Sequence, residues 1–189
     1  AGAMDKGRDL IKEFQDAGYR YAPTRTELDA ATAGAGAGKL LGLFAFSNMN
    51  VALDKIDGRR GKKQGLAGGS VVDDYGFPDQ PMLDEMAKAA IATLKKQPKG
   101  FVLMIEGASI DKQAHNMDSE RWMLDTIEFD RAVQVAQDFA RENGDTLVIV
   151  TADHECSGAA LIGGSMLTDK ALQEAIQKKG AANLRDKVV

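Results

Sequence analysis

The chain contains two histidines, and each lies close to a carboxylate in the sequence. Asp111 and His115 are four positions apart, so one helical turn would place both side chains on one face, able to hold one cation. Asp153 and His154 are adjacent, which suits a bend whose successive side chains point into one cavity. Mixed carboxylate and imidazole donors favour zinc over magnesium. Glu106 offers only oxygen and would suit a neighbouring hard cation such as magnesium.

Both histidine clusters follow apolar segments that the sequence predicts to be buried strands. Residues 100–105 (GFVLMI) lead into the segment Glu106–His115, and residues 145–151 (DTLVIVT) lead into Ala152–Glu155. In open α/β sheets, ligands bind outside the carboxyl ends of the strands, so both clusters are expected at one edge of a sheet. The alternative at this point is that each Asp–His pair is a helix cap or a salt bridge.

Buried strands that alternate with amphipathic helices predict an α/β sandwich, in which a largely parallel sheet lies between helices. A third buried strand is expected at residues 40–46 (LLGLFAF). Helices are expected at residues 5–17, 26–33, 81–97, 118–143 and 169–178. Residues 47–80 contain no long periodic segment. Residues 1–4 look like a cloning remnant, and residues 5–189 are expected to form a single domain.

Composition argues against several classes of protein. The 24 basic and 28 acidic residues give a net charge of −4, which removes the basic field that nucleic-acid binding needs. The single cysteine, Cys156, cannot form an internal disulfide and excludes cysteine-rich zinc modules. No apolar run reaches the roughly 18 residues of a membrane span, and the first residues lack the apolar region of a signal peptide. The glycine-rich segment 34–39 lacks the spacing of a phosphate-binding loop.

Two longer motifs resemble the metal-binding stretches of alkaline phosphatases. FVLMIEGASIDKQAH at Phe101–His115 is similar to the first of these stretches, and VIVTADHE at residues 148–155 is similar to the second. LGLFA at 41–45, ALDK at 52–55 and LDTIEFDRAVQVA at 124–136 add supporting similarity. The resemblance covers roughly residues 8–160.

This resemblance implies a role for each motif residue. Asp111 with His115 would bind one zinc ion, and Asp153 with His154 would bind a second. Glu106 would bind magnesium, and Lys112 would contact phosphate through water. It further implies an incomplete alkaline-phosphatase-like α/β fold with two zinc ions and magnesium in the complete site. Phosphate monoesters and inorganic phosphate would be its ligands, the protein would be periplasmic or secreted, and a homodimer is compatible with the family.

Other parts of the family pattern are missing from the sequence. No Asp-Ser/Thr-Ala nucleophile motif occurs, and no histidine follows His154 to supply the third imidazole of the first zinc site. Each zinc would find two ligands here, whereas catalytic zinc normally has three from the protein. We therefore expect the middle to C-terminal part of a phosphomonoesterase catalytic domain, cut at both ends, without a nucleophile, and inactive alone.

Two alternatives remain open. The first is a fragment of a phosphodiesterase with the same metal core, against which Lys112 argues mildly because a monoester carries more negative charge to offset. The second is a non-catalytic module that keeps the fold for binding or packing, although two half-sites would then have no evident use.

Overall fold

Residues 7–33, 38–59 and 79–159 are described by the structure, a computed structural model of the 189-residue chain. All of the helices and strands in these ranges lie in the compact unit that ends at Ser157.

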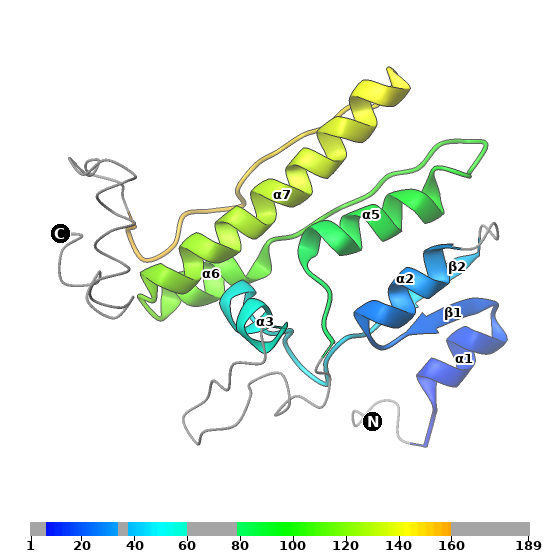
Figure 1. Ribbon diagram of the computed structural model, residues 1–189, viewed down its shortest axis with the longest axis horizontal. Coiled ribbons are helices and arrows are strands. Elements are labelled where there is room, and N and C mark those ends of the chain that lie inside the picture. The colour runs from blue at the N-terminus through cyan, green and yellow to red at the C-terminus, as the bar shows by residue number, and fades with distance from the viewer. Residues whose placement is uncertain (1–6, 34–37, 60–78, 160–189) are drawn as a thin grey trace. The chain divides into compact units, whose positions relative to one another are not determined.

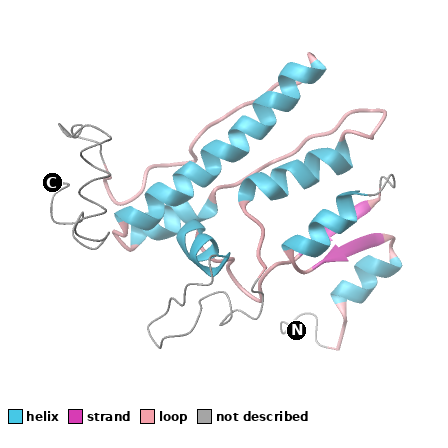
Figure 2. Ribbon diagram, in the orientation of Figure 1, coloured by secondary structure: helices cyan, strands magenta, loops and turns pink. Residues whose placement is uncertain are grey.

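Helices predominate among the described residues, as Figure 2 shows. In chain order the elements are α1 (Leu10–Asp16), β1 (Tyr19–Ala22), α2 (Arg25–Ala33), β2 (Lys39–Gly42), α3 (Ala52–Arg59), α5 (Leu83–Leu94), α6 (Ala108–His115) and α7 (Ser119–Asn143) (Figure 1). Four predicted helices are confirmed with shifted ends as α1, α2, α5 and α7, and the one predicted at 169–178 lies outside the described residues. The predicted strand at 40–46 is reduced to β2. The sequence did not predict α3, which is only 8 residues long.

The two strands form a parallel pair with α2 as the connection between them. Tyr19 lies opposite Lys39, and Ala22 lies opposite Gly42. Parallel strands cannot be joined by a tight turn, and a helix such as α2 supplies the crossover that they require. The parallel sheet with its helices confirms the predicted α/β class.

A small apolar core joins this strand pair to α5. Its buried members are Ala22, Leu28, Phe44 and Ala89, with Leu40, Met49 and Met86 packed around them. Glycine is required at the end of β2, because a Cβ atom on Gly42 would lie 2.5 Å from Cζ of Phe44. The core therefore fixes the start of the segment that leads to α3.

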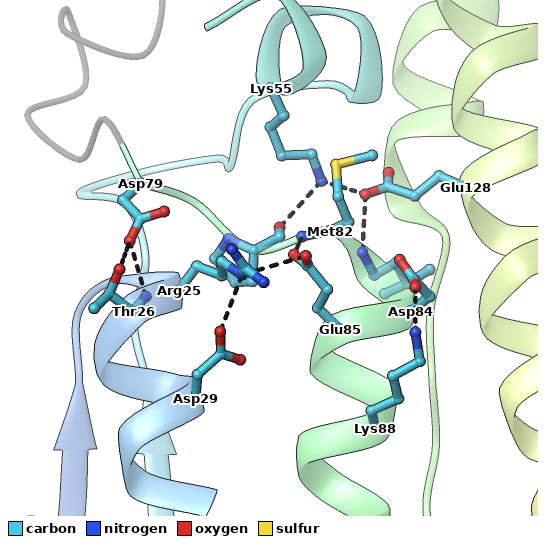
Figure 3. Close-up of polar contacts among 12 residues, drawn as sticks. Arg25, Thr26, Asp29, Lys55, Asp79, Met82, Asp84, Glu85, Lys88 and Glu128 are labelled. Atoms are coloured by element: carbon cyan, nitrogen blue, oxygen red, sulfur yellow. Dashed lines mark hydrogen bonds and ion pairs between the residues drawn. The ribbon is translucent and has the colours of Figure 1, made fainter. Parts of the chain in front are cut away.

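Buried polar groups connect α7 to α3 and α5. Lys55 of α3 and Glu128 of α7 form an ion pair in which both side chains are less than a tenth exposed. Glu128 Oε1 also accepts a hydrogen bond of 2.9 Å from the backbone N–H of Leu83, at the start of α5 (Figure 3). Asp125, one turn earlier on α7, accepts from the backbone N–H of Ala52 at 3.1 Å. Because each group would be buried without a partner if displaced, these contacts hold α7 in one register.

The prediction of buried strands at residues 100–105 and 145–151 is wrong for the described part of the chain. Both segments pair with no described strand. Their most exposed large apolar side chains, between 77% and 97% accessible, are Val102, Met104, Leu147 and Ile149. The ring of Phe101 packs 5.8 Å from that of Phe139, so α7 covers one side of the first segment. A run of apolar residues indicates that a segment tends to be buried. Burial of both faces of a strand, however, requires a neighbouring element on each face.

Candidate metal centre

The first predicted cluster lies on α6, which begins immediately after the extended segment 100–105. Gly107 is the N-cap of α6, and a Cβ atom there would lie 3.1 Å from side-chain atoms of both Ile110 and Phe129. The close approach of α6 to α7 at this point therefore favours glycine. Asp111 and His115 lie on one face of the helix, with His115 Nε2 3.4 Å from Asp111 Oδ1. The prediction that one helical turn aligns this pair is confirmed.

The second predicted cluster forms a bend beyond the extended segment 145–151. The backbone N–H of His154 donates to Oδ1 of Asp153 at 2.9 Å, and His154 Nδ1 lies 2.8 Å from the carbonyl oxygen of Glu155. The Glu155 carbonyl, followed by the charges of Asp153 and Asp111, raises the pKa of His154. Because Asp111 belongs to α6, the two clusters lie close enough to interact electrostatically.

A direct contact also joins the clusters. The thiol of Cys156 donates to the backbone carbonyl oxygen of Asp111, with a sulfur–oxygen distance of 3.8 Å. One oxygen, nitrogen or sulfur donor each from Asp111, His115 and Cys156 lies within 4.8 Å of the other two. Oδ1 of Asp111 is itself inaccessible to solvent, although the side chain as a whole is 41% exposed, and this oxygen faces His115 Nε2 at 3.4 Å.

Carboxylate, imidazole and thiol are all donors that zinc accepts in proteins, so the residues present fit a metal of that type. The 3.4 Å approach of His115 to Asp111 also fits a salt bridge between the two side chains.

No ligand role for Cys156 was predicted from the sequence, although this residue directly follows the second motif. The hydrogen bond with Ser157 lowers the pKa of the Cys156 thiol, but partial burial, hydrogen bonding to Asp111 and the charges of Asp111 and Glu155 raise it overall.

The remaining predicted ligands are not drawn into this three-donor group. The side chains of Asp153 and His154 are 86% and 57% exposed, and that of Glu106 is exposed in the segment just before α6. All three belong to the segments that lead into the group, but within the described residues they stand outside it.

Lys112 lies at an open hollow beside His115. The hollow has a volume of about 430 Å³ and is lined in part by Asn48, Lys112, His115, Asn116 and Arg121. Nζ of Lys112 donates to Oδ1 of Asn48 at 2.9 Å, which ties α6 to the segment before α3. Hydrogen bonding to Asp118, together with the charge of Asp54, raises the pKa of Arg121. This guanidinium already forms ion pairs with both carboxylates. Asn48 carries no signal in the sequence, because its contact with Lys112 joins positions 64 apart.

Comparisons with known proteins agree on one family. A sequence profile described as alkaline phosphatase matches residues 1–184. Alkaline phosphatase H of Pseudomonas aeruginosa strain UCBPP-PA14 is 39% identical over 149 residues, covering 78% of this chain and 31% of the relative. Alkaline phosphatase of Escherichia coli K12 is 38% identical over 153 residues, covering 79% and 32%. The crystal structure of Thermus thermophilus alkaline phosphatase superposes with a TM-score of 0.56 at 30% identity, covering 72% of this chain and 24% of that one.

The chain spans about a third of the length of the curated relatives that it matches. Across the described ranges, no helix combines the length and apolar character needed to cross a bilayer.

Proposed function

Since the chain belongs to the alkaline phosphatase family, we propose that it carries the metal-binding portion of a phosphomonoester hydrolase. The observation that supports this most is that the two motifs lie together: Cys156, which directly follows the second motif, contacts Asp111 of the first, and His115 lies one turn further along α6.

The proposed ligands follow the two motifs. Metal use is a property of the family, and here Asp111 and His115 would hold one zinc, Asp153 and His154 a second, and Glu106 magnesium. When bound, the zinc pair would supply Lewis-acid stabilisation of the charge on phosphate oxygens. The chain itself contributes the orientation of these donors, through the α6 face and the hydrogen bonds within the bend at 153–155.

Lys112 is the proposed contact to phosphate, through water. Its ammonium is held by Asn48 beside His115 and keeps two further N–H donors for an anion. A monoester dianion carries more charge than a diester, so a cation at this place favours phosphate monoesters as substrates and inorganic phosphate as product. A phosphodiesterase with the same metal core is the second candidate, and it would gain less from Lys112.

By itself the 189-residue chain is proposed to have no turnover, because its sequence contains no Asp-Ser/Thr-Ala nucleophile motif. In keeping with the bacterial relatives, we place the working enzyme in the periplasm or outside the cell, and a homodimer is compatible with it.

A chimaeric enzyme tests this proposal. Residues 101–157 of this chain would replace the matching segment of the Escherichia coli alkaline phosphatase. We expect the chimaera to hydrolyse p-nitrophenyl phosphate and to leave bis(p-nitrophenyl) phosphate largely intact. A preference for the diester, or full activity after Asp111→Ala in the chimaera, would contradict the proposal. The chain alone should show no turnover above its own Asp153→Ala control with zinc and magnesium added.

A further inference from the structure

We infer that Asn48 is a positioning residue for Lys112: its neutral amide holds the lysine ammonium beside His115 and leaves the positive charge available to the proposed phosphate ligand. This inference rests on the proposed function and adds a residue that lies outside both sequence motifs. Nζ of Lys112 donates to Oδ1 of Asn48 at 2.9 Å, across 64 positions of the sequence. Both side chains line the hollow that His115 also borders.

The segment that carries Asn48 is held in place by its neighbours in the chain. The backbone N–H of Asn50, a buried residue, donates to Oε1 of Gln80 at 2.9 Å. Met49 packs against the apolar core that joins the strand pair to α5. Asn48 therefore presents its amide from a fixed backbone. Because a lysine side chain is long and flexible, this hydrogen bond restricts where the ammonium can lie.

The acceptor on Asn48 is an amide oxygen and carries no net charge. A carboxylate at the same place would pair with the ammonium of Lys112 and offset its charge, whereas an amide oxygen accepts one N–H and leaves that charge intact. Within the described ranges, no carboxylate forms an ion pair with Lys112. Arg121 lines the same hollow and shows the contrast, because Asp54 and Asp118 both form ion pairs with it. Lys112 therefore keeps its charge for a phosphate dianion.

Two substitutions separate the placement of the ammonium from the preservation of its charge. Asn48→Ala removes the acceptor, so the ammonium loses its fixed place and phosphate should bind about threefold more weakly. Asn48→Asp keeps an acceptor oxygen on a side chain of the same size but adds a negative charge, so phosphate should bind roughly fivefold more weakly. Asn48 is exposed, so neither substitution should disturb folding.

A longer chimaeric enzyme measures these effects. Residues 38–157 of this chain would replace the matching segment of the Escherichia coli alkaline phosphatase, and inhibition by inorganic phosphate would be measured beside metal content. Both Asn48 variants should weaken the inhibition by the factors given and keep the metal. In a Lys112→Ala background, Asn48→Ala should have no further effect, because the amide acts only through the ammonium.

Asn143→Asp is the matched control for the added charge. Asn143 is the last residue of α7, whereas Arg121 at the hollow lies in the first turn of the same helix. The two positions are 22 residues apart, about 33 Å at 1.5 Å per residue, which is several times the screening length of salt at physiological strength. Asn143→Asp should therefore leave phosphate inhibition unchanged.

The contact itself is measured on the intact 189-residue chain by nuclear magnetic resonance of isotope-labelled lysine. The ammonium signal of Lys112 is identified by its loss in Lys112→Arg. Its protons should exchange with water several-fold faster in Asn48→Ala than in the wild-type chain, because the hydrogen bond that retains them is gone. This measurement requires no activity, metal or substrate.

Unchanged phosphate inhibition in either Asn48 variant, additive effects of Asn48→Ala and Lys112→Ala, or equal proton exchange in the wild-type chain and Asn48→Ala would each overturn the inference. An inactive chimaera together with faster proton exchange in Asn48→Ala would contradict the proposed function and support the placement of Lys112 by Asn48.

Discussion

At the scale of single residues, Asp111 and Lys112 are neighbours on α6 with different surroundings. Asp111 has a buried carboxylate oxygen within the three-donor group, and Lys112 extends to Asn48 at the edge of the hollow. Their roles in the chimaeric enzyme should therefore separate. Asp111→Ala should lower zinc content and rate by orders of magnitude, because an anionic ligand is lost.

Lys112→Ala should instead keep the metal and weaken inhibition by inorganic phosphate roughly fivefold, since an exposed charge pair is worth about 1 kcal/mol. Metal analysis beside phosphate inhibition measures both effects. Loss of zinc in Lys112→Ala with retention in Asp111→Ala would show that the assignment of the two neighbours is wrong.

Asp125 gives a prediction about pH, because burial raises its pKa to about 6 while the backbone N–H of Ala52 acts in the opposite direction. A carboxyl whose folded-state pKa is raised contributes stability at low pH and loses it as pH rises from about 4 through about 6. The shift corresponds to up to about 3 kcal/mol of the free energy of unfolding.

Asp125→Asn keeps an oxygen for the Ala52 N–H and cannot ionise, so it should remove this part of the pH dependence. Urea unfolding between pH 4 and pH 7 compares the two proteins. The variant should gain stability relative to wild type as pH rises, and parallel curves would mean that Asp125 does not titrate in that window.

At the scale of elements, the end of β2 depends on a close contact between Gly42 and Phe44. A Cβ atom at position 42 would overlap the buried ring, so Gly42→Ala should lower the free energy of unfolding by about 1–3 kcal/mol. Gly38, just before β2, is the matched control, because a Cβ there would meet only the guanidinium of Arg20, with Nε at 3.5 Å and Nη2 at 3.9 Å. Gly38→Ala should change stability by less than about 0.5 kcal/mol. Equal urea midpoints for the two variants would contradict the role given to Gly42.

Elements with local signals were predictable from the sequence, and those that depend on distant partners were not. The helix α7 has its N-cap at Asp118, whose side chain accepts from the backbone of Arg121, and ends at Gly144 with a φ of 74°. Both signals lie in the sequence. The segments 100–105 and 145–151 are apolar, but a strand forms only when it pairs with another strand. The residues of one segment do not identify that pairing partner. For the same reason the motifs predicted Asp111 with His115, whereas Cys156 was recognised only through a contact across 45 positions.

At the scale of the whole described unit, the two extended segments leave large apolar side chains uncovered. Val102, Met104, Leu147 and Ile149 are each more than three quarters exposed. Exposed apolar side chains on unpaired extended backbone favour association with other chains.

The isolated chain should therefore bind a hydrophobic dye and self-associate in a concentration-dependent way. Val102→Lys combined with Leu147→Lys should lower dye binding by roughly half and reduce the apparent mass in light scattering. Met117→Lys, at another exposed site, is the control and should change neither. Undiminished association of the double variant would mean that another surface is responsible.

The length of α7 has a consequence for the metal centre. Its 25 residues, at 1.5 Å each, extend about 37 Å, and the helix begins directly after α6. The chain must cover that distance again to bring Cys156 back to Asp111. Residues 145–156 reach about 40 Å at about 3.3 Å per residue, which suffices only while they remain extended. Deleting one residue there would shorten the reach by about 3.3 Å, so the spacing between the motifs decides whether their donors meet.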